Sequence, residues 1–152
     1  MGKVRKLQLL KIAKSYLRQA EARLKDAKDA LAEGNYPYAV RLSQECVELS
    51  LKAVLKAVGI DYPKVHDVSD ILLDIKERFP EWFKAEIEFL RESSKILAKK
   101  REISLYGGEE AFLAPEDVIS REDADDAVRR AIITHGLCNR LVIEIEGKTL
   151  SS

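Results

Sequence analysis

Four residues in two separate segments have side chains that could bind a phosphate. Lys64 and His66 stand in the segment PKVHD, residues 63–67, which follows a long apolar stretch, and Arg101 and Tyr106 stand at the end of a later helical pattern. Ammonium, imidazolium and guanidinium groups donate hydrogen bonds to phosphate oxygens, and a phenol can donate one or stack on a base. We therefore expect these four residues to be the polar groups nearest to any bound phosphate or base.

Each of these residues also has a purely structural interpretation. His66 can fix the loop ahead of the next helix without joining Lys64 and Arg101 around a phosphate. Arg101 can pair with a carboxylate of the acidic segment 109–126, and Tyr106 can pack against the rest of the fold. The sequence leaves both interpretations open.

The composition describes an ordinary globular protein. Apolar residues make up 46% and charged residues 34% of the 152 residues, a length that fits one domain over residues 1–152, with its core at about residues 5–146. No uninterrupted run of about 18 apolar residues occurs, so we expect no membrane-spanning helix and no membrane partner. The basic N-terminus lacks the apolar core of a signal peptide, and we expect a cytoplasmic protein.

The sequence carries no sign of a metal or a cofactor, and we expect neither. Its two cysteines, Cys46 and Cys138, fall on apolar helical faces, where packed thiols are expected rather than a disulfide. No Cys/His spacing indicates zinc. No glycine-rich phosphate loop, nucleophile elbow or pair of catalytic carboxylates is present either.

The charges are unevenly spread although the net charge is zero. Residues 1–28 contain nine Lys/Arg and two Asp/Glu, a balance of +7, and residues 109–126 contain eight Asp/Glu and one Arg, a balance of −7. The two segments can be solvated faces that attract one another, within the fold or across a dimer. Alternatively, the basic segment can meet RNA or another polyanion.

The first helical segment has a strict heptad pattern. It is built from alternating leucines and alanines, namely Leu10, Ala13, Leu17, Ala20, Leu24, Ala27 and Leu31. Such a seam serves either a leucine-zipper dimer or one half of an antiparallel hairpin within the chain. We favour the hairpin, because Gly34-Asn35 supplies a turn directly after the seam.

The segment from Asn35 to Val58 is apolar around most of its circumference. A helix of this kind must lie at the centre of a bundle, and Gly59 is expected to be its C-cap. A shorter helix is expected to start after Asp67 and to run to about Arg78.

Three further expectations complete the fold. Pro80 opens a helix that runs to Arg101, residues 102–119 form an exposed loop, and Ser120-x-x-Asp123 starts the last helix with a capping box. The last six residues, GKTLSS, are expected to be a frayed tail. The predicted fold class is all-α, an antiparallel up-and-down bundle of four to five helices.

The pattern P-K-x-H-D-x-x-x-x-L at residues 63–72 resembles that of HEPN domains. The Arg-x4-Tyr segment at residues 101–106 and a last helix after an acidic cap are also similar to this family, and the resemblance covers about residues 8–145. It implies a helical bundle that is usually a homodimer. It also implies association with a nucleotide or RNA, and with a minimal nucleotidyltransferase partner, in some cases as a toxin–antitoxin pair.

Catalytic members of the family cut RNA with an Arg-x4–6-His motif, two copies of which face one another across a dimer. In the matching segment here, Tyr106 stands where the histidine would be. A phenol, with a pKa of about 10, is a poor general base at neutral pH. The asparagine that usually follows the arginine is also absent, because Glu102 follows Arg101. These departures weigh against nuclease activity, and Arg101 and Tyr106 are weak candidates for catalysis.

A literal match to the motif occurs later, from Arg130 to His135. Residues five apart on a helix lie about 140° from one another, so the two side chains do not share a face. His135 also falls on the apolar stripe of the last helix. We interpret it as a core or interface histidine, and the match as a decoy.

Three functions remain open from the sequence. The first is a nucleotide- or RNA-associated accessory module that acts with a minimal nucleotidyltransferase. The second is a metal-independent ribonuclease, and the third is a purely structural interaction domain.

Overall fold

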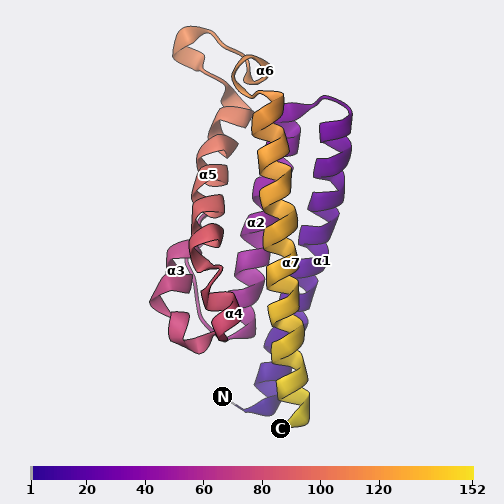
Figure 1. Ribbon diagram of the computed structural model, residues 1–152, viewed down its shortest axis with the longest axis vertical. Coiled ribbons are helices and arrows are strands. Elements are labelled where there is room, and N and C mark those ends of the chain that lie inside the picture. The colour runs from indigo at the N-terminus through magenta and orange to yellow at the C-terminus, as the bar shows by residue number, and fades with distance from the viewer. Residues whose placement is uncertain (1) are drawn as a thin grey trace.

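The computed structural model describes residues 2–152, which form helices and turns but no strand (Figure 1). The long helices α1, α2, α5 and α7 run alternately up and down, which confirms the predicted all-α bundle. The helices are α1 (Lys3–Ala32), α2 (Tyr36–Ala57), α3 (Ser69–Asp74), α4 (Glu81–Lys84), α5 (Ile87–Tyr106), α6 (Pro115–Val118) and α7 (Arg121–Ser151), with 3₁₀ turns at Lys76–Arg78 and Glu109–Ala111.

The seam of α1 packs within the chain, as the hairpin interpretation predicted. Its leucines and alanines are buried from Leu10 to Ala27, and α1 lies against α2 and α7. Gly34 turns the chain with a φ of 77°, and the Asn35 side chain accepts a hydrogen bond from the Tyr38 amide at 3.4 Å. The small alanines let the neighbouring helices approach α1 closely.

The central helix is α2, also as predicted, because it packs against α1, α5 and α7. Its buried apolar residues are Ala39, Val40, Leu42, Cys46, Val47, Leu51, Ala53, Val54, Leu55 and Ala57. The helix ends at Ala57 with Val58 as its C-cap, one residue before the predicted Gly59. Gly59 follows with a φ of 73° and allows the Ile60 amide to bond back to the Leu55 carbonyl at 2.9 Å.

The helix predicted from Pro80 to Arg101 is interrupted. It begins after Pro80, as expected, but α4 ends at Lys84 and α5 begins at Ile87. A tight bond from the Glu86 amide to the Phe83 carbonyl closes the turn between them. The aromatic rings there also pack together, with the Phe79 and Phe83 centroids 4.9 Å apart.

The prediction of an exposed loop at residues 102–119 is wrong in two respects: the first residues of this segment are helical, and the rest is folded. No helix-breaking residue occurs before Gly107, so α5 continues to Tyr106. Gly107 then ends it with a φ of 66°, where an added Cβ would lie only 2.2 Å from the Leu113 carbonyl oxygen. Residues 107–118, named here the arm, are a folded projection above α5 (Figure 1).

The prediction of a frayed C-terminal tail is also wrong, because α7 continues to Ser151. The Thr149 hydroxyl bonds to the Ile145 carbonyl at 2.9 Å, and Lys3 Nζ donates to the Ser152 carbonyl at 2.9 Å. A cation at a helix C-terminus satisfies its unpaired carbonyls and complements its dipole.

The two cysteines are free and buried, which confirms the expectation of packed thiols. Burial raises the pKa of the Cys46 thiol to about 12 and also raises that of Cys138. Both are therefore unreactive thiols at neutral pH. In residues 2–152, no helix has the length and apolarity needed to cross a membrane.

Asp67 holds the loop after α2 in place. One of its carboxylate oxygens accepts hydrogen bonds from the Ser69 amide (2.9 Å), the Ser69 hydroxyl (2.6 Å) and the Ser94 hydroxyl (2.7 Å), and the other accepts from Lys95 at 3.0 Å. Burial acts to raise the pKa of Asp67, but the bonds from Ser69, Ser94 and Lys95 outweigh it. They lower this pKa from 3.8 to about 2. The helix expected after Asp67 does begin there, at Ser69, but α3 ends at Asp74 and a separate 3₁₀ turn covers Lys76–Arg78.

Replacing Leu51 with aspartate should unfold the protein. Leu51 is fully buried in α2, and an unpaired charge there costs several kcal/mol. Thermal and urea unfolding followed by circular dichroism would measure the loss, with Ile12→Asp, at an exposed position on α1, as the control. A soluble, fully helical Leu51→Asp protein would contradict the central placement of α2.

Replacing Asp67 with asparagine should destabilise the protein in a pH-dependent way. Because the folded-state pKa lies below its ordinary value of 3.8, the ionised carboxylate stabilises the fold above that pH, and the stabilisation is lost as pH falls toward about 2. We expect Asp67→Asn to cost about 1–2 kcal/mol at pH 7, after allowance for solvent screening. Urea unfolding at several pH values should show the difference from wild type shrinking below pH 4. Asp74→Asn, at an exposed carboxylate with no ion pair in residues 2–152, is the matched control. A gap that is constant between pH 7 and pH 2.5 would count against this role for the charge.

Candidate functional site

Among the polar residues of α2, Gln44, Glu45 and Glu48 form one connected group. Gln44 is only 2% exposed. Its amide nitrogen donates to Oε1 of Glu48 at 2.9 Å, and its amide oxygen accepts from Nη1 of Arg101 at 2.8 Å. The buried amide is thus bonded at both ends, and it links Arg101 on α5 to Glu48.

Arg101 pairs with α2 and not with the acidic segment 109–126. Its Nη1 lies 3.4 Å from Oε2 of Glu45. The structural alternative for Arg101 was therefore right that it pairs with a carboxylate and wrong about which one. Lys100, its neighbour, makes the contact with the acidic segment, through Asp123.

His66 lies against the other end of this network. Its Nδ1 is 2.7 Å from Oε1 of Glu48. An ionised carboxylate only accepts hydrogen bonds, so Nδ1 of His66 is the donor in this contact, and Nε2 takes no part in it. The His66 side chain is 57% exposed. The imidazole is therefore oriented by a carboxylate on one side while its ring is open to solvent.

Glu48 is held in its ionised form. Burial acts to raise the pKa of Glu48, but hydrogen bonds from Lys52, Gln44 and His66 outweigh burial and lower it. Lys52 supplies the strongest of them, with Nζ 2.8 Å from Oε2 of Glu48. A carboxylate that stays charged at neutral pH can keep His66 in one tautomer and one orientation.

The four predicted site residues are only partly brought together. His66 and Arg101 are linked by the chain of hydrogen bonds through Glu48 and Gln44. Lys64 is exposed, two residues before His66 in the same loop, and makes no side-chain bond within residues 2–152. Tyr106 is 61% exposed at the end of α5. It does not pack into the bundle, contrary to the structural alternative.

Sequence reasoning missed Gln44 and Glu48, the residues that connect the site. The sequence did contain a sign that these two residues meet. Gln44 and Glu48 are four positions apart on a mostly apolar helix, and residues at that spacing share a face. A buried amide in such a helix must find hydrogen-bond partners. Within residues 2–152, no group of three His, Cys, Asp or Glu side chains is arranged to hold a metal ion.

The later Arg130–His135 match does not form a site in this chain. Arg130 bonds to Asp126 at 2.8 Å and to the Ser93 hydroxyl on α5 at 3.0 Å. His135 is half-buried on another side of α7, with Nε2 3.1 Å from the Leu17 carbonyl on α1. The two side chains face different helices, as their spacing along the helix predicts.

One curated relative matches part of the chain. It is named "Putative toxin MJ1304" and comes from Methanocaldococcus jannaschii, and it is 39% identical over 66 residues. That match covers 43% of this chain and 43% of the relative, so the chain aligns with less than half of the relative's length.

Two crystal structures are similar over most of the chain, each at 26% identity. TT1696 from Thermus thermophilus superposes with a TM-score of 0.67 over 84% of this chain and 96% of its own. ST0689, described as an archaeal HEPN homologue, gives a TM-score of 0.60 over 90% of this chain and 97% of its own. A family model described as the HEPN domain matches residues 13–141. Because this family model matches most of the chain, the chain belongs to the HEPN domain family.

Proposed function

We propose that this chain binds RNA or a nucleotide through the loop at residues 63–67 and acts as an accessory module of a toxin–antitoxin-type pair. The observation that carries the proposal is the contact between Glu48 and His66, 2.7 Å apart, which holds an exposed imidazole beside the exposed Lys64. Membership of the HEPN family and the similarity to a protein named as a toxin support the same function.

In this proposal Arg101 acts indirectly. One of its donors is bonded to Gln44 and approaches Glu45, so its guanidinium is committed mainly to α2. Arg101 fixes Gln44, Gln44 fixes Glu48, and Glu48 orients His66. His66 and Lys64 then meet the phosphate directly, and Tyr106 offers an exposed ring for a base.

Metal-independent ribonuclease activity is the second candidate function, and one observation favours it. Glu48 holds the proton on Nδ1 of His66, so Nε2 can accept a proton from a ribose hydroxyl. The imidazole would then take the part of the histidine that the family motif has where Tyr106 stands.

The partners follow from the same proposal. We infer a minimal nucleotidyltransferase as the protein partner and a homodimer as the working form. The third alternative, a purely structural interaction domain, would bind that partner but no nucleotide.

Removing the His66 imidazole should weaken RNA or nucleotide binding about tenfold, because one charge-assisted contact is lost. Calorimetric titration of wild type, His66→Ala and Arg101→Ala with a short RNA and with ATP would measure this. Arg121→Ala is the control, because it removes an exposed guanidinium from the acidic segment.

The double variant His66→Ala/Arg101→Ala separates a direct role of Arg101 from an indirect one. If Arg101 acts through His66, the double variant should bind no more weakly than His66→Ala. A site at this loop is ruled out if all variants bind like wild type, or if wild type binds nothing phosphorylated at millimolar concentration.

The ribonuclease alternative makes a different prediction. RNA cleavage in the presence of EDTA should be lost in His66→Ala and retained in Tyr106→Phe, because Nε2 of His66 is the proposed base. Cleavage that survives His66→Ala but not Tyr106→Phe would shift the chemistry to the family segment at residues 101–106. No cleavage by the wild type leaves the accessory module as the favoured function.

A further inference from the structure

Two surfaces at opposite ends of the bundle both combine apolar side chains with charge, and their charges are opposite in sign. One is the arm, residues 107–118, and the other is a pocket where the last turns of α7 meet the end of α2. We propose that the arm of one copy docks into this pocket of a second copy, and that two such contacts build a two-fold dimer across α7.

The arm presents an apolar tip. Phe112 is 96% exposed, and Leu113 beside it is also exposed. Phe112 has a φ of 57°, in the left-handed region that bulky residues rarely adopt. Two hydrogen bonds between Gly108 and Leu113, both 2.9 Å, hold the tip in this shape. A large ring fixed in solvent on a strained backbone is the kind of feature that marks a binding contact.

The arm is also acidic. It contains Glu109, Glu110, Glu116 and Asp117 and no Lys or Arg. The Asp117 carboxylate accepts a hydrogen bond from the Ala114 amide at 2.9 Å, but the three glutamates form no ion pair within residues 2–152. A partner surface for the arm must therefore combine an apolar hollow with positive charge.

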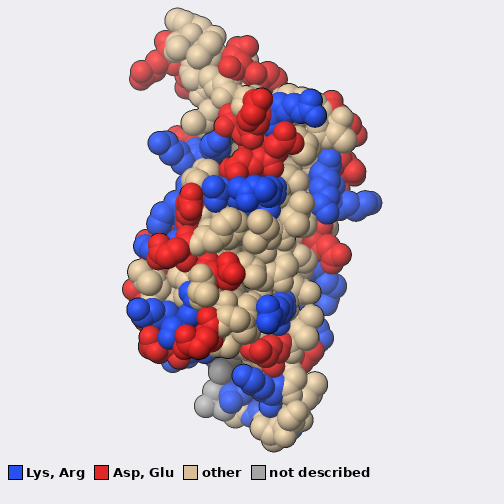
Figure 2. All heavy atoms as spheres, viewed as in Figure 1, with Lys and Arg blue, Asp and Glu red and all other residues tan. Residues whose placement is uncertain are grey.

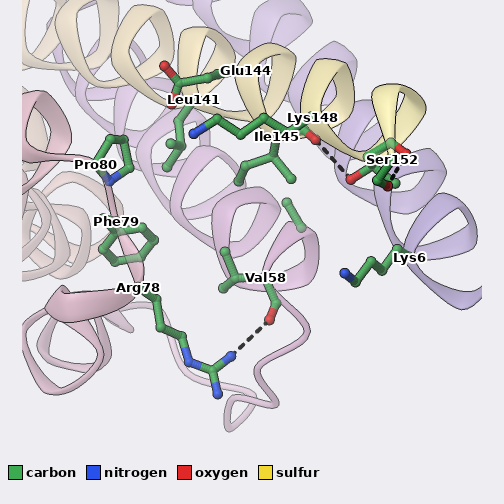
Figure 3. A pocket seen from close by; sticks show the side chains of 12 residues that line it. Lys6, Val58, Arg78, Phe79, Pro80, Leu141, Glu144, Ile145, Lys148 and Ser152 are labelled. Carbon is green, nitrogen blue, oxygen red and sulfur yellow. Dashed lines mark hydrogen bonds between the residues drawn. The ribbon is translucent and has the colours of Figure 1, made fainter. Parts of the chain in front are cut away.

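The pocket supplies the apolar hollow. It has a volume of about 670 Å³, and its floor is made by Val58, Phe79, Leu141 and Ile145 (Figure 3). This volume is within the range of ligand pockets in proteins and exceeds that of one phenylalanine ring. No other part of the described chain fills it.

The rim of the pocket supplies the positive charge. It carries three cations, Lys6, Arg78 and Lys148, against one carboxylate, Glu144. Arg78 donates to the Val58 carbonyl at 3.3 Å, which caps α2. Lys6 and Lys148 form no ion pair in residues 2–152, so both are available to glutamates that approach from outside.

The arm cannot reach the pocket of its own chain, because the two lie at opposite ends of the bundle (Figure 1). Within residues 2–152, the basic segment forms no ion pair with the acidic segment 109–126, and its ion pairs go to Glu146 and Glu45. Attraction across a dimer and contact of the basic segment with RNA or another polyanion both remain as alternatives.

The bundle has the geometry that such a dimer needs. In Figure 1 the arm lies near the start of α7, and the end of α2 and the start of α4, whose neighbouring residues line the pocket, lie on the same side of α7 near its other end. Between them, the outer face of α7 exposes Ile132, Ile133 and Ile143, and uncharged surface covers the middle of this face (Figure 2). Two copies of α7 that cross in antiparallel fashion at Ile132 and Ile133 set the end of the arm beside Lys148 of the other copy. A two-fold axis at the crossing makes both contacts identical.

This inference gives a geometry to the homodimer proposed above, but it does not rest on the loop at residues 63–67. Sedimentation equilibrium should find wild-type dimers, and Phe112→Ala and Lys148→Glu should each raise the dissociation constant at least about tenfold, as for a central contact in an interface. Ile12→Ala removes a comparable exposed apolar side chain from α1 and should change nothing. Circular dichroism checks that each variant is folded.

Cross-linking between two chains gives the sharper test. Bismaleimide cross-linking between Phe112→Cys in one chain and Lys148→Cys in another should give a covalent dimer, because the native cysteines are buried.

Three results would overturn the proposal. They are a wild type that stays monomeric at millimolar concentration, variants that dimerise as tightly as wild type, and a Phe112→Cys and Lys148→Cys pair that gives no covalent dimer. If Phe112→Ala loses dimerisation but still binds RNA or ATP like wild type, the dimer contact stands apart from the phosphate site. The failure of one proposal is then distinguishable from the failure of the other.

Discussion

The burial of α2 on all sides is the constraint on which the rest of the structure depends. Helices α1, α5 and α7 must enclose it, so their own apolar stripes all turn toward the same axis. A buried side-chain amide on α2 must then find its partners inside the bundle. Gln44 does so through Arg101 and Glu48, and Glu48 is thereby placed to hold His66. The candidate site thus arises where the central helix departs from being apolar.

Much of the fold could be predicted because its signals are local. The leucine–alanine seam, the turn at Gly34, the start of α2 at Asn35 and the capping box at Ser120 each depend on residues within a few positions of one another. The burial of α2 follows from its own composition. Such features need no knowledge of the rest of the chain.

The remaining features depend on contacts between distant segments. Arg101 and Gln44 are 57 positions apart, and no periodicity in either helix indicates that they meet. The arm depends on the fit of Gly107 against the Leu113 carbonyl, and a sequence containing two glycines reads equally well as a flexible turn. The end of α7 is fixed by Lys3, from the other end of the chain. For such contacts, the type of a residue indicates which bonds its side chain can form, but it does not indicate which distant residue will be the partner.

The hairpin of α1 and α2 has a consequence for how the protein folds. Its contacts join neighbours in the sequence and close a short turn, whereas α7 must return to the same two helices across some 60 intervening residues. Loops of that length close more slowly and with a greater loss of entropy. We expect the hairpin to form early and α7 to dock last. Hydrogen exchange pulsed during refolding would then protect amides of α1 and α2 before those of α7, and simultaneous protection would contradict this order.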